Sequence, residues 1–181
     1  MIIRFVGFGG QGIVLSSYIM GLSAVLDGKR ALQNQSYGSE SRGGECRGDV
    51  IIAEDEIHEL EPTGYDVLVA MTQPGYEKFI ASLKPRGTLV VDSDLVAPKA
   101  DLNPSDIGIH GIRATDIAFK DFGRRIIANM VILGYMNSLL NLVSNESLER
   151  AISLSVPRGS EQLNLDAMHA GMQLATGETL K

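Results

Sequence analysis

The stretch that most constrains the fold is the glycine-rich segment GFGGQG, residues 7–12. It follows the apolar run IIRFV at residues 2–6 and leads into IVL at residues 13–15. A strand, a tight turn and a helix in this order are typical of the G-x-G-x-x-G motif, whose glycines permit the turn, the approach of a ligand and close helix–strand packing. Free N–H groups at the helix start then face an anion. We therefore predict an anion-binding turn, with close packing alone as the alternative.

Short β-branched apolar runs alternate with helical patterns along the rest of the chain. The predicted strands are residues 2–7, 31–35, 49–53, 66–71, 88–92 and 107–112. The predicted helices are residues 11–26, 74–83, 114–119, 124–143, 147–155 and 161–175. This alternation predicts an α/β fold with a doubly wound, mostly parallel, Rossmann-like sheet and a helical carboxyl-terminal third, in one domain over residues 1–181. We expect the second strand to lie beside the first, with Gly87 ending a helix before the fifth strand.

The composition excludes several classes of protein. The 181 residues carry a net charge of -6, which argues against nucleic acid as a partner because phosphate backbones attract an excess of lysine and arginine. The single cysteine cannot form an internal disulfide or supply the four thiolates of an iron–sulfur cluster. The three histidines show no metal-ligand spacing. With no basic leader before an apolar segment, we expect no signal peptide and a cytoplasmic location.

One apolar segment, residues 126–143, is uncharged and about long enough to span a membrane. It contains Asn129, Asn137 and Asn141, whose amides are costly to transfer into lipid. At helical spacing these amides and Gly134 share one side, while the other positions are apolar. We therefore predict no membrane span, but a helix buried against the sheet or against a partner chain.

The neighbouring motifs narrow the ligand of the glycine turn. A dinucleotide site would place an acidic residue at the end of the second strand, but residues 32–36 read LQNQS, which disfavours NAD. The segment SYGSESRGGECRGDV, residues 36–50, places Arg42 beside Gly43 and Gly44, so a backbone nest and a guanidinium could bind a carboxylate or phosphate. The alternative is a solvated loop with paired charges. Cys46 is interpreted as a small structural residue, with a thiol activated by nearby arginines as the alternative.

At these residues the chain resembles a known family. GFGGQGIVLSS followed by QSYGSESRGGECRGDVIIAEDEI is similar to the gamma subunit of 2-oxoacid:ferredoxin oxidoreductases of the 2-oxoglutarate, 2-ketoisovalerate and pyruvate type. The family pattern is G-x-G-G-Q-G, then S-Y-G-x-E-x-R-G-G, then an apolar strand ending in acidic residues. The resemblance covers nearly the whole chain. The matching positions are Gly7, Gly9, Gly10, Gln11 and Gly12 in the first motif and Ser36, Tyr37, Gly38, Glu40, Arg42, Gly43 and Gly44 in the second.

The resemblance implies one subunit of a larger enzyme. Such complexes contain alpha, beta, gamma and often delta subunits, and they convert a 2-oxoacid to its acyl-coenzyme A while reducing ferredoxin. Thiamine diphosphate and iron–sulfur clusters belong to the partner subunits, so we expect this chain to bind no cofactor alone and to be inactive alone. The apolar helix over residues 124–143 and an apolar sheet edge should pack against a neighbour, so we expect a homodimer when the partners are absent. Coenzyme A is the co-substrate that it would help to bind.

The resemblance also assigns candidate residues. The predicted cofactor-binding residues are Gly7, Gly9, Gly10, Gln11, Gly12, Tyr37, Arg42, Gly43 and Gly44. We expect Arg42 to contact a phosphate of coenzyme A or a carboxylate of a partner subunit. The sequence contains no recognisable catalytic set, so none is assigned. An independent nucleotide-binding Rossmann-like module is the alternative function, and a scaffold that binds nothing is a third.

Overall fold

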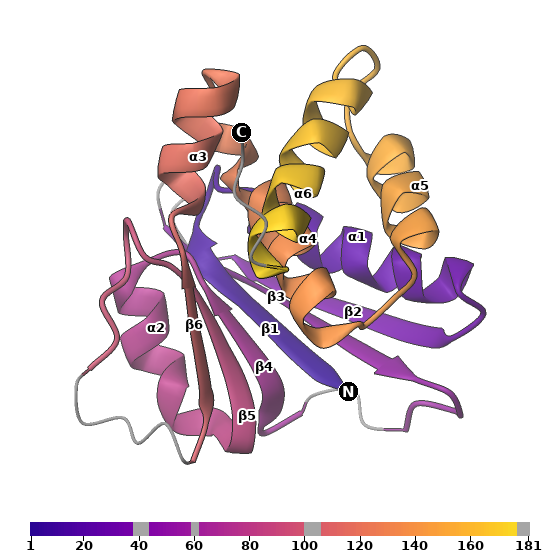
Figure 1. Ribbon diagram of the computed structural model, residues 1–181. Coiled ribbons are helices and arrows are strands. Elements are labelled where there is room, and N and C mark those ends of the chain that lie inside the picture. The colour runs from indigo at the N-terminus through magenta and orange to yellow at the C-terminus, as the bar shows by residue number, and fades with distance from the viewer. Residues whose placement is uncertain (38–43, 59–61, 100–105, 177–181) are drawn as a thin grey trace.

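The computed structural model of the chain describes residues 1–37, 44–58, 62–99 and 106–176, which form one six-stranded sheet with helices on both faces (Figure 1). The order of the strands across the sheet is β2-β3-β1-β4-β5-β6. The strands are β1 Ile2–Phe8, β2 Arg30–Tyr37, β3 Glu45–Ala53, β4 Tyr65–Ala70, β5 Leu83–Asp92 and β6 Gly108–Ile112. Strand β3 is antiparallel to its two neighbours, whereas β1, β4, β5 and β6 are parallel.

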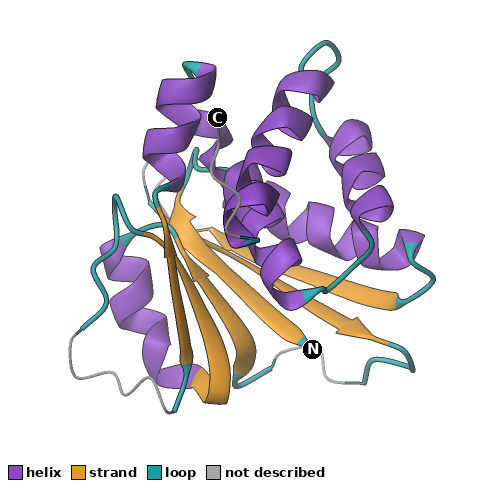
Figure 2. Ribbon diagram, viewed as in Figure 1, coloured by secondary structure: helices purple, strands orange, loops and turns teal. Residues whose placement is uncertain are grey.

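The helices divide unevenly between the two faces. They are α1 Ile13–Leu26, α2 Gln73–Phe79, α3 Ala114–Phe122, α4 Ala128–Leu140, α5 Asn145–Ser155 and α6 Glu161–Ala175. Figure 2 shows α2 on one face and the remaining helices gathered on the other. A short 3₁₀ turn at Ile80–Ser82 follows α2, and another at Arg125–Ile127 precedes α4. The predicted α/β fold with a helical carboxyl-terminal third is confirmed.

Two hydrophobic cores result because successive side chains of a strand point to opposite faces of the sheet. Ile3 and Phe5 of β1 join the larger core under α1, α4, α5 and α6. Val6 points the other way and packs in a smaller core with Tyr76 and Phe79 from the α2 segment. All five side chains are buried. The parallel strands are therefore apolar at successive positions, as a sheet covered on both faces requires.

The predicted order of the first strands is wrong, because β3 lies between β2 and β1. The sequence predicts a long loop over residues 36–48, but strand β2 continues to Tyr37 and β3 begins at Glu45, so these two strands form a hairpin. Because β2 is antiparallel to β3, and β3 is antiparallel to β1, strands β2 and β1 run in the same direction. The end of β2 therefore opens on the same sheet edge as the glycine turn, as expected, although the strands are not neighbours.

Two predicted boundaries also change. Strand β5 begins at Leu83, so Gly87 lies inside this strand and does not end the preceding helix. The predicted helix over residues 124–143 begins as a 3₁₀ turn, continues as α4 and stops at Asn141. Asn141 has a φ of 50° and is the left-handed C-cap of α4. Asparagine tolerates this conformation better than most residues, which explains the end of the helix within an apolar run.

Helix α4 is buried within the chain and packs closely against α6. Gly134 and Gly171 allow this approach, because a Cβ atom at Gly134 would lie 1.9 Å from the carbonyl oxygen of Met168, and one at Gly171 would lie 1.9 Å from that of Val131. Asn137 of α4 donates from Nδ2 to the Val143 carbonyl and accepts from the Val143 N–H. The neighbour expected for this helix is thus α6 of the same chain. The homodimer stays a prediction and loses this support.

No helix in the described part of the chain is long and apolar enough to cross a membrane.

The α4–α6 contact predicts a large difference between two glycine substitutions. Gly171→Ala should lower the free energy of unfolding by about 1–3 kcal/mol, because its methyl group would overlap the Val131 carbonyl oxygen. Gly21→Ala in α1 is the matched control, because its Cβ atom would lie 3.3 Å from a methyl group of Val50. Alanine is also about 1 kcal/mol more favourable than glycine inside a helix. Urea unfolding of both variants measures the difference. Equal stability of the two would contradict the close packing of α4 and α6.

Candidate functional site

A cavity of about 660 Å³ lies at the carboxyl ends of the parallel strands. In open α/β sheets, ligands bind outside these carboxyl ends, next to the central strand from which the sheet extends in both directions. Here β1 is that strand, because β3 and β2 extend the sheet on one side and β4, β5 and β6 on the other. The residues that line the cavity are Gly10, Gln11, Met71, Asp94, Leu95, Thr115, Asp116, Phe119, Arg125, Ile126 and Ala128.

The two glycine motifs meet at this edge. The Gly9 N–H donates a hydrogen bond of 3.1 Å to the Gly44 carbonyl, which joins the turn after β1 to the residue before β3. The pairing of Phe8 with Glu45 continues the same contact along the two strands. Gly9 and Gly44 are 35 residues apart in the sequence, but the antiparallel pairing of β1 and β3 brings them together. Gly44, the last residue of the second motif, therefore borders the turn that the first motif forms.

The Gln11 side chain braces the turn against the next parallel strand. Its Oε1 accepts a hydrogen bond of 2.7 Å from the Phe8 N–H, and its Nε2 donates at 3.1 Å to the Met71 carbonyl. The Met71 N–H in turn donates to the Val6 carbonyl. Gln11 thus joins the ends of β1 and β4. Both polar atoms of its amide are hydrogen-bonded to backbone groups, and the side chain forms part of the cavity wall.

Gly12 allows the start of α1 to pack against α4. Its φ is 74°, and a Cβ atom there would lie 2.4 Å from Nδ2 of Asn129, so only glycine fits without displacement. Asn129 donates to the Gly12 carbonyl and to Ser16 Oγ, both at 3.4 Å. No side chain caps α1, whose amino terminus begins beside the cavity-lining Gly10. The partial positive charge of this terminus attracts an anion in the cavity.

A buried carboxyl group lies at the end of β5 beneath the opposite wall. Asp92 is fully buried and accepts hydrogen bonds from Thr115 Oγ1 at 2.5 Å and from the Asp94 N–H at 3.2 Å. Burial raises the pKa of Asp92, although both hydrogen bonds favour the ionised form. Because Thr115 and Asp94 line the cavity, Asp92 holds two of its wall segments together.

The two acidic residues of the wall are neutralised by neighbouring cations. Arg113 Nε donates to Asp94 at 2.9 Å, and Lys120 Nζ lies 2.9 Å from Asp116. The hydrogen bond from Lys120 holds the pKa of Asp116 below its ordinary value. Their negative charges are thus compensated, and they oppose an anion at the glycine turn less than two free carboxylates would.

The cavity mouth has an apolar rim. Leu95, Phe119 and Ile126 line the cavity and are 41%, 51% and 64% exposed. The Arg125 guanidinium lies 4.7 Å from the centre of the Phe119 ring, a cation–π contact that leaves its charge at the mouth. The cavity therefore offers positive groups for an anion together with an apolar surface for the rest of an amphipathic ligand.

The structure brings most of the predicted residues to one edge of the sheet, in different roles. Gly10 and Gln11 line the cavity, Gly9 and Gly44 join the two motifs, and Gly12 seats α1. Gly7 lies within β1, and Tyr37 is the last residue of β2, paired with Cys46. Arg42 and Gly43 lie outside the described residues, as do Gly38 and Glu40. Their predicted contacts with a ligand stay predictions.

Sequence reasoning missed the far walls of the cavity. Met71, Asp94 and Leu95 follow the ends of β4 and β5, two strands that the periodicity had located. Ligands bind at the carboxyl ends of the parallel strands in open α/β sheets, so the same reasoning that placed a site after β1 could have identified residues after β4 and β5. Phe119, Arg125 and Ile126 belong to helical segments whose position depends on packing, so no local pattern marks them.

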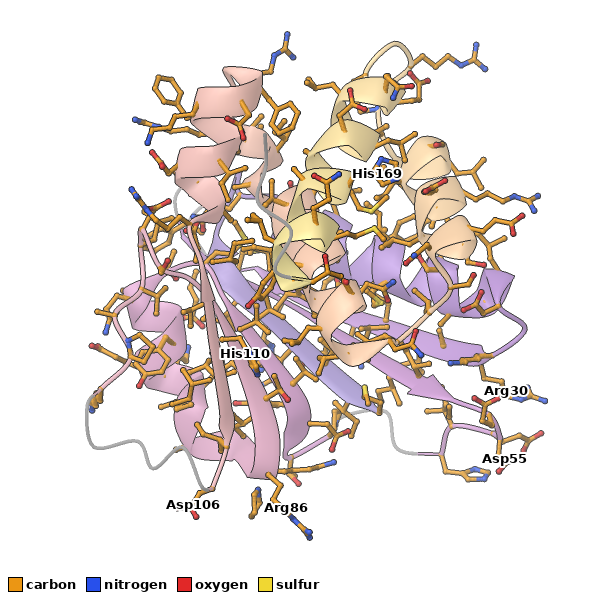
Figure 3. All side chains as sticks on the ribbon, in the orientation of Figure 1. Arg30, Asp55, Arg86, Asp106, His110 and His169 are labelled. Carbon is orange, nitrogen blue, oxygen red and sulfur yellow. The ribbon has the colours of Figure 1, made fainter. Side chains whose placement is uncertain are left out.

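Cys46 has the inert role expected for a structural residue. Its side chain is 4% exposed within the larger core, and burial raises the pKa of its thiol. Arg47 follows it on the strand and therefore points to the other face of the sheet. Among the residues that the structure describes, no group of three or more histidine, cysteine, aspartate or glutamate side chains could hold a metal ion. Figure 3 shows His110 on the sheet and His169 in the helical layer.

Comparison with known proteins gives a consistent result over nearly the whole chain. The family model described as pyruvate ferredoxin/flavodoxin oxidoreductase matches residues 2–174. The 2-oxoglutarate synthase subunit KorC of Methanocaldococcus jannaschii is 42% identical, over 96% of this chain and 92% of that protein.

Two solved structures share the fold over nearly the whole of this chain. The gamma subunit of a keto/oxoacid ferredoxin oxidoreductase from Geobacter sulfurreducens is 40% identical, with a TM-score of 0.83 over 97% of this chain and 98% of that one. A 2-oxoglutarate:ferredoxin oxidoreductase from Magnetococcus marinus, with 2-oxoglutarate, coenzyme A and succinyl-coenzyme A bound, is 25% identical, with a TM-score of 0.87. That match covers 99% of this chain and 31% of the other.

The raised pKa of Asp92 predicts a pH-dependent effect of Asp92→Asn. The folded protein keeps this carboxyl protonated where the unfolded chain ionises it, so its contribution to stability falls as the pH rises from 3.8 toward the raised pKa. The stability of the variant relative to the wild type should therefore increase through this window and then stay constant. Thermal unfolding across pH tests this, with the exposed Asp121→Asn as control. Parallel pH profiles for Asp92→Asn and the wild type would refute it.

Proposed function

Because this chain belongs to the pyruvate ferredoxin/flavodoxin oxidoreductase family, as a gamma subunit of a 2-oxoacid:ferredoxin oxidoreductase, we propose that it serves a complex acting on 2-oxoglutarate and forms one side of the coenzyme A site. The observation that carries the coenzyme A proposal is the cavity at the end of β1, which combines an uncapped helix amino terminus, Arg125 and an apolar rim. Membership of the family argues against an independent nucleotide-binding module.

The choice of 2-oxoglutarate rests on the relatives. Four of them, between 30% and 42% identical, are named as 2-oxoglutarate synthase subunit KorC, and the chain covers most of their length. Other relatives, at 30% and 29% identity, are subunits named for ketoisovalerate and pyruvate. The solved relative with 2-oxoglutarate and coenzyme A bound supports the same substrate. We expect the pocket for the 2-oxoacid to lie in other subunits.

Coenzyme A suits the cavity because it combines anionic phosphates with an uncharged part, and the cavity combines positive groups with an apolar rim. Its phosphates would bind at the Gly10 backbone and the α1 amino terminus, where backbone N–H groups and the helix dipole favour negative charge. Arg125 supplies a full positive charge near the mouth. Phe119 and Ile126 offer apolar surface for the uncharged part of the ligand. The predicted role of Arg42 is to add a second guanidinium from the loop after β2.

The apolar rim also favours closure by other subunits. Leu95, Phe119 and Ile126 expose large apolar side chains around the mouth, and such a patch is typical of a surface that a partner covers. We propose that the alpha and beta subunits close the cavity here, with a delta subunit in some complexes. These partners would supply thiamine diphosphate chemistry and iron–sulfur clusters, with ferredoxin as the electron acceptor. The role of this chain is then to bind and orient coenzyme A, so it would be inactive alone.

Reconstitution tests the substrate. The complex purified with this chain should reduce a viologen dye with 2-oxoglutarate and coenzyme A, and it should prefer 2-oxoglutarate to pyruvate and 2-ketoisovalerate. The partners without this chain, and this chain without the partners, are the controls. A preference for another 2-oxoacid would overturn the substrate proposal, and turnover by the isolated chain would overturn its role as a subunit.

A matched pair of arginine variants tests the coenzyme A site. Arg125→Ala should raise the apparent KM for coenzyme A about tenfold, because a charge-assisted hydrogen bond to phosphate is lost, and leave the KM for 2-oxoglutarate unchanged. Arg124→Ala is the control, because Arg124 is exposed next to it but does not line the cavity. Steady-state kinetics of the reconstituted complex provide both constants. Equal effects of the two substitutions on the KM for coenzyme A would rule out this cavity as its site.

A further inference from the structure

Strand β2 is an edge strand that lacks the usual protection. It pairs with β3 over eight residues in unbroken register and has no second neighbour within the described residues (Figure 1). Natural proteins protect such edges with short strands, prolines, bulges or several charges. The sequence RALQNQSY contains no proline and only one charged residue, Arg30, whereas the opposite edge strand β6 has five residues. Apart from Asn34, whose carbonyl accepts a hydrogen bond of 3.5 Å from Gln33 Nε2, strand β2 therefore presents backbone groups suited to pairing with another strand.

An apolar shelf borders this edge on the side of α1. The fourteen residues of α1 include no charged residue. A Cβ atom at Gly21 would face Val50 of β3 and Ala31 of β2, so this side of the helix lies over the edge of the sheet. Tyr18 and Val25 are within about 60° of Gly21 around the helix and are 50% and 52% exposed. They therefore continue an apolar surface beyond β2.

The other face of the same edge is polar and basic. A groove of about 360 Å³ is lined by Arg4, Asn34, Gln35, Arg47, Asp49, Pro62 and Thr63. Arg4 and Asp49 form a buried bidentate ion pair with two 2.6 Å hydrogen bonds, so their charges cancel. Arg47 forms no ion pair with any residue that the structure describes, and neither does Arg30. Among the residues that the structure describes, no acidic side chain therefore compensates the positive charge of Arg47 in the groove, although the chain has a net charge of -6.

These charges disfavour a second copy of the chain on β2. Arg30 and Ser36 point to the same face, because they are six residues apart on the strand. A symmetric antiparallel pair centred on Gln33 would place Arg30 of one copy opposite Ser36 of the other. Ser36 pairs with Arg47 on β3, so each end of the interface would bring two arginines together. The two arginines would lie on the same face with only Ser36 between them, so their like charges would repel, and an acidic strand fits better.

We propose that β2 binds an extended segment of another protein, in which apolar and acidic residues alternate. Its backbone would continue the sheet beyond β2, its apolar side chains would cover Tyr18 and Val25, and its carboxylates would face Arg47 and Arg30. In such strand additions the backbone supplies affinity and the alternate side chains supply specificity. This surface shares no residue with the cavity, so the proposal stands independently of the coenzyme A site.

A designed peptide tests the proposal on the whole chain. The probe is a fluorescein-labelled eight-residue peptide in which valine and glutamate alternate, and fluorescence anisotropy measures its binding. One control peptide replaces glutamate with lysine, and another has the same composition in blocks that break the alternation. We expect the alternating acidic peptide to bind at least about tenfold more tightly than either control. Hydrogen exchange should show new protection of backbone amides within residues 30–37.

Charge-reversal variants locate the site. Arg47→Glu and Arg30→Glu should each weaken binding of the acidic peptide about tenfold and improve binding of the lysine peptide. Arg158→Glu, at an exposed position between α5 and α6, is the matched control and should change neither. Thermal unfolding verifies that each variant is folded, and Arg30→Glu, at an exposed position, provides the test if Arg47→Glu unfolds.

Three results would overturn the proposal. The first is equal binding of the acidic and lysine peptides, and the second is binding without protection of β2. The third is a dimer of the isolated chain, in sedimentation, that protects β2 from hydrogen exchange without any peptide. That result would show a second copy at this edge.

Discussion

The contact between Gly12 and Asn129 is the constraint on which the candidate site depends. It joins the turn after β1 to the second residue of α4, 117 residues further along the chain. Because a Cβ atom at Gly12 would lie 2.4 Å from the Asn129 amide, any other residue would separate α1 from α4 or displace the amide. Gln11 makes the corresponding connection to β4 through the Met71 carbonyl. The glycine turn is therefore held from both sides before any ligand binds.

This rigid turn faces a mouth that is open. Its walls are fixed by internal hydrogen bonds, such as those of Asp92 with Thr115 and Asp94, whereas Phe119 and Ile126 expose apolar surface at the rim. A preorganised turn with an uncovered apolar border suits a subunit that contributes one side of a shared cleft. The unprotected edge at β2 offers a second contact surface on a separate part of the sheet. Both features fit a chain that works within a larger assembly.

Much of the fold was predictable because its signals are local. The period of apolar residues located all six strands and all six α-helices, although some boundaries differ, and the glycine turn after β1 is correct in position and context. The place of β3 was not predictable in the same way. Its first residues, ECRG, lack the apolar run of a buried strand, and its position beside β1 depends on pairing between residues 37 to 49 apart. Asn141 likewise ends α4 within a sequence that reads as continuous helix.

The sequence by itself determined the family, the α/β class and the glycine turn between β1 and α1, because these depend on residue types at fixed short spacings. Only the tertiary structure decided what surrounds that turn. Hydrogen bonds across the sheet and between helices gave Gln11 and Asn129 their bracing roles, and strand alternation placed Cys46 in the core, away from Arg47. Arg125, Phe119 and Ile126 reach the cavity because α3 and α4 pack over the sheet edge, a consequence of long-range packing that short sequence patterns do not encode.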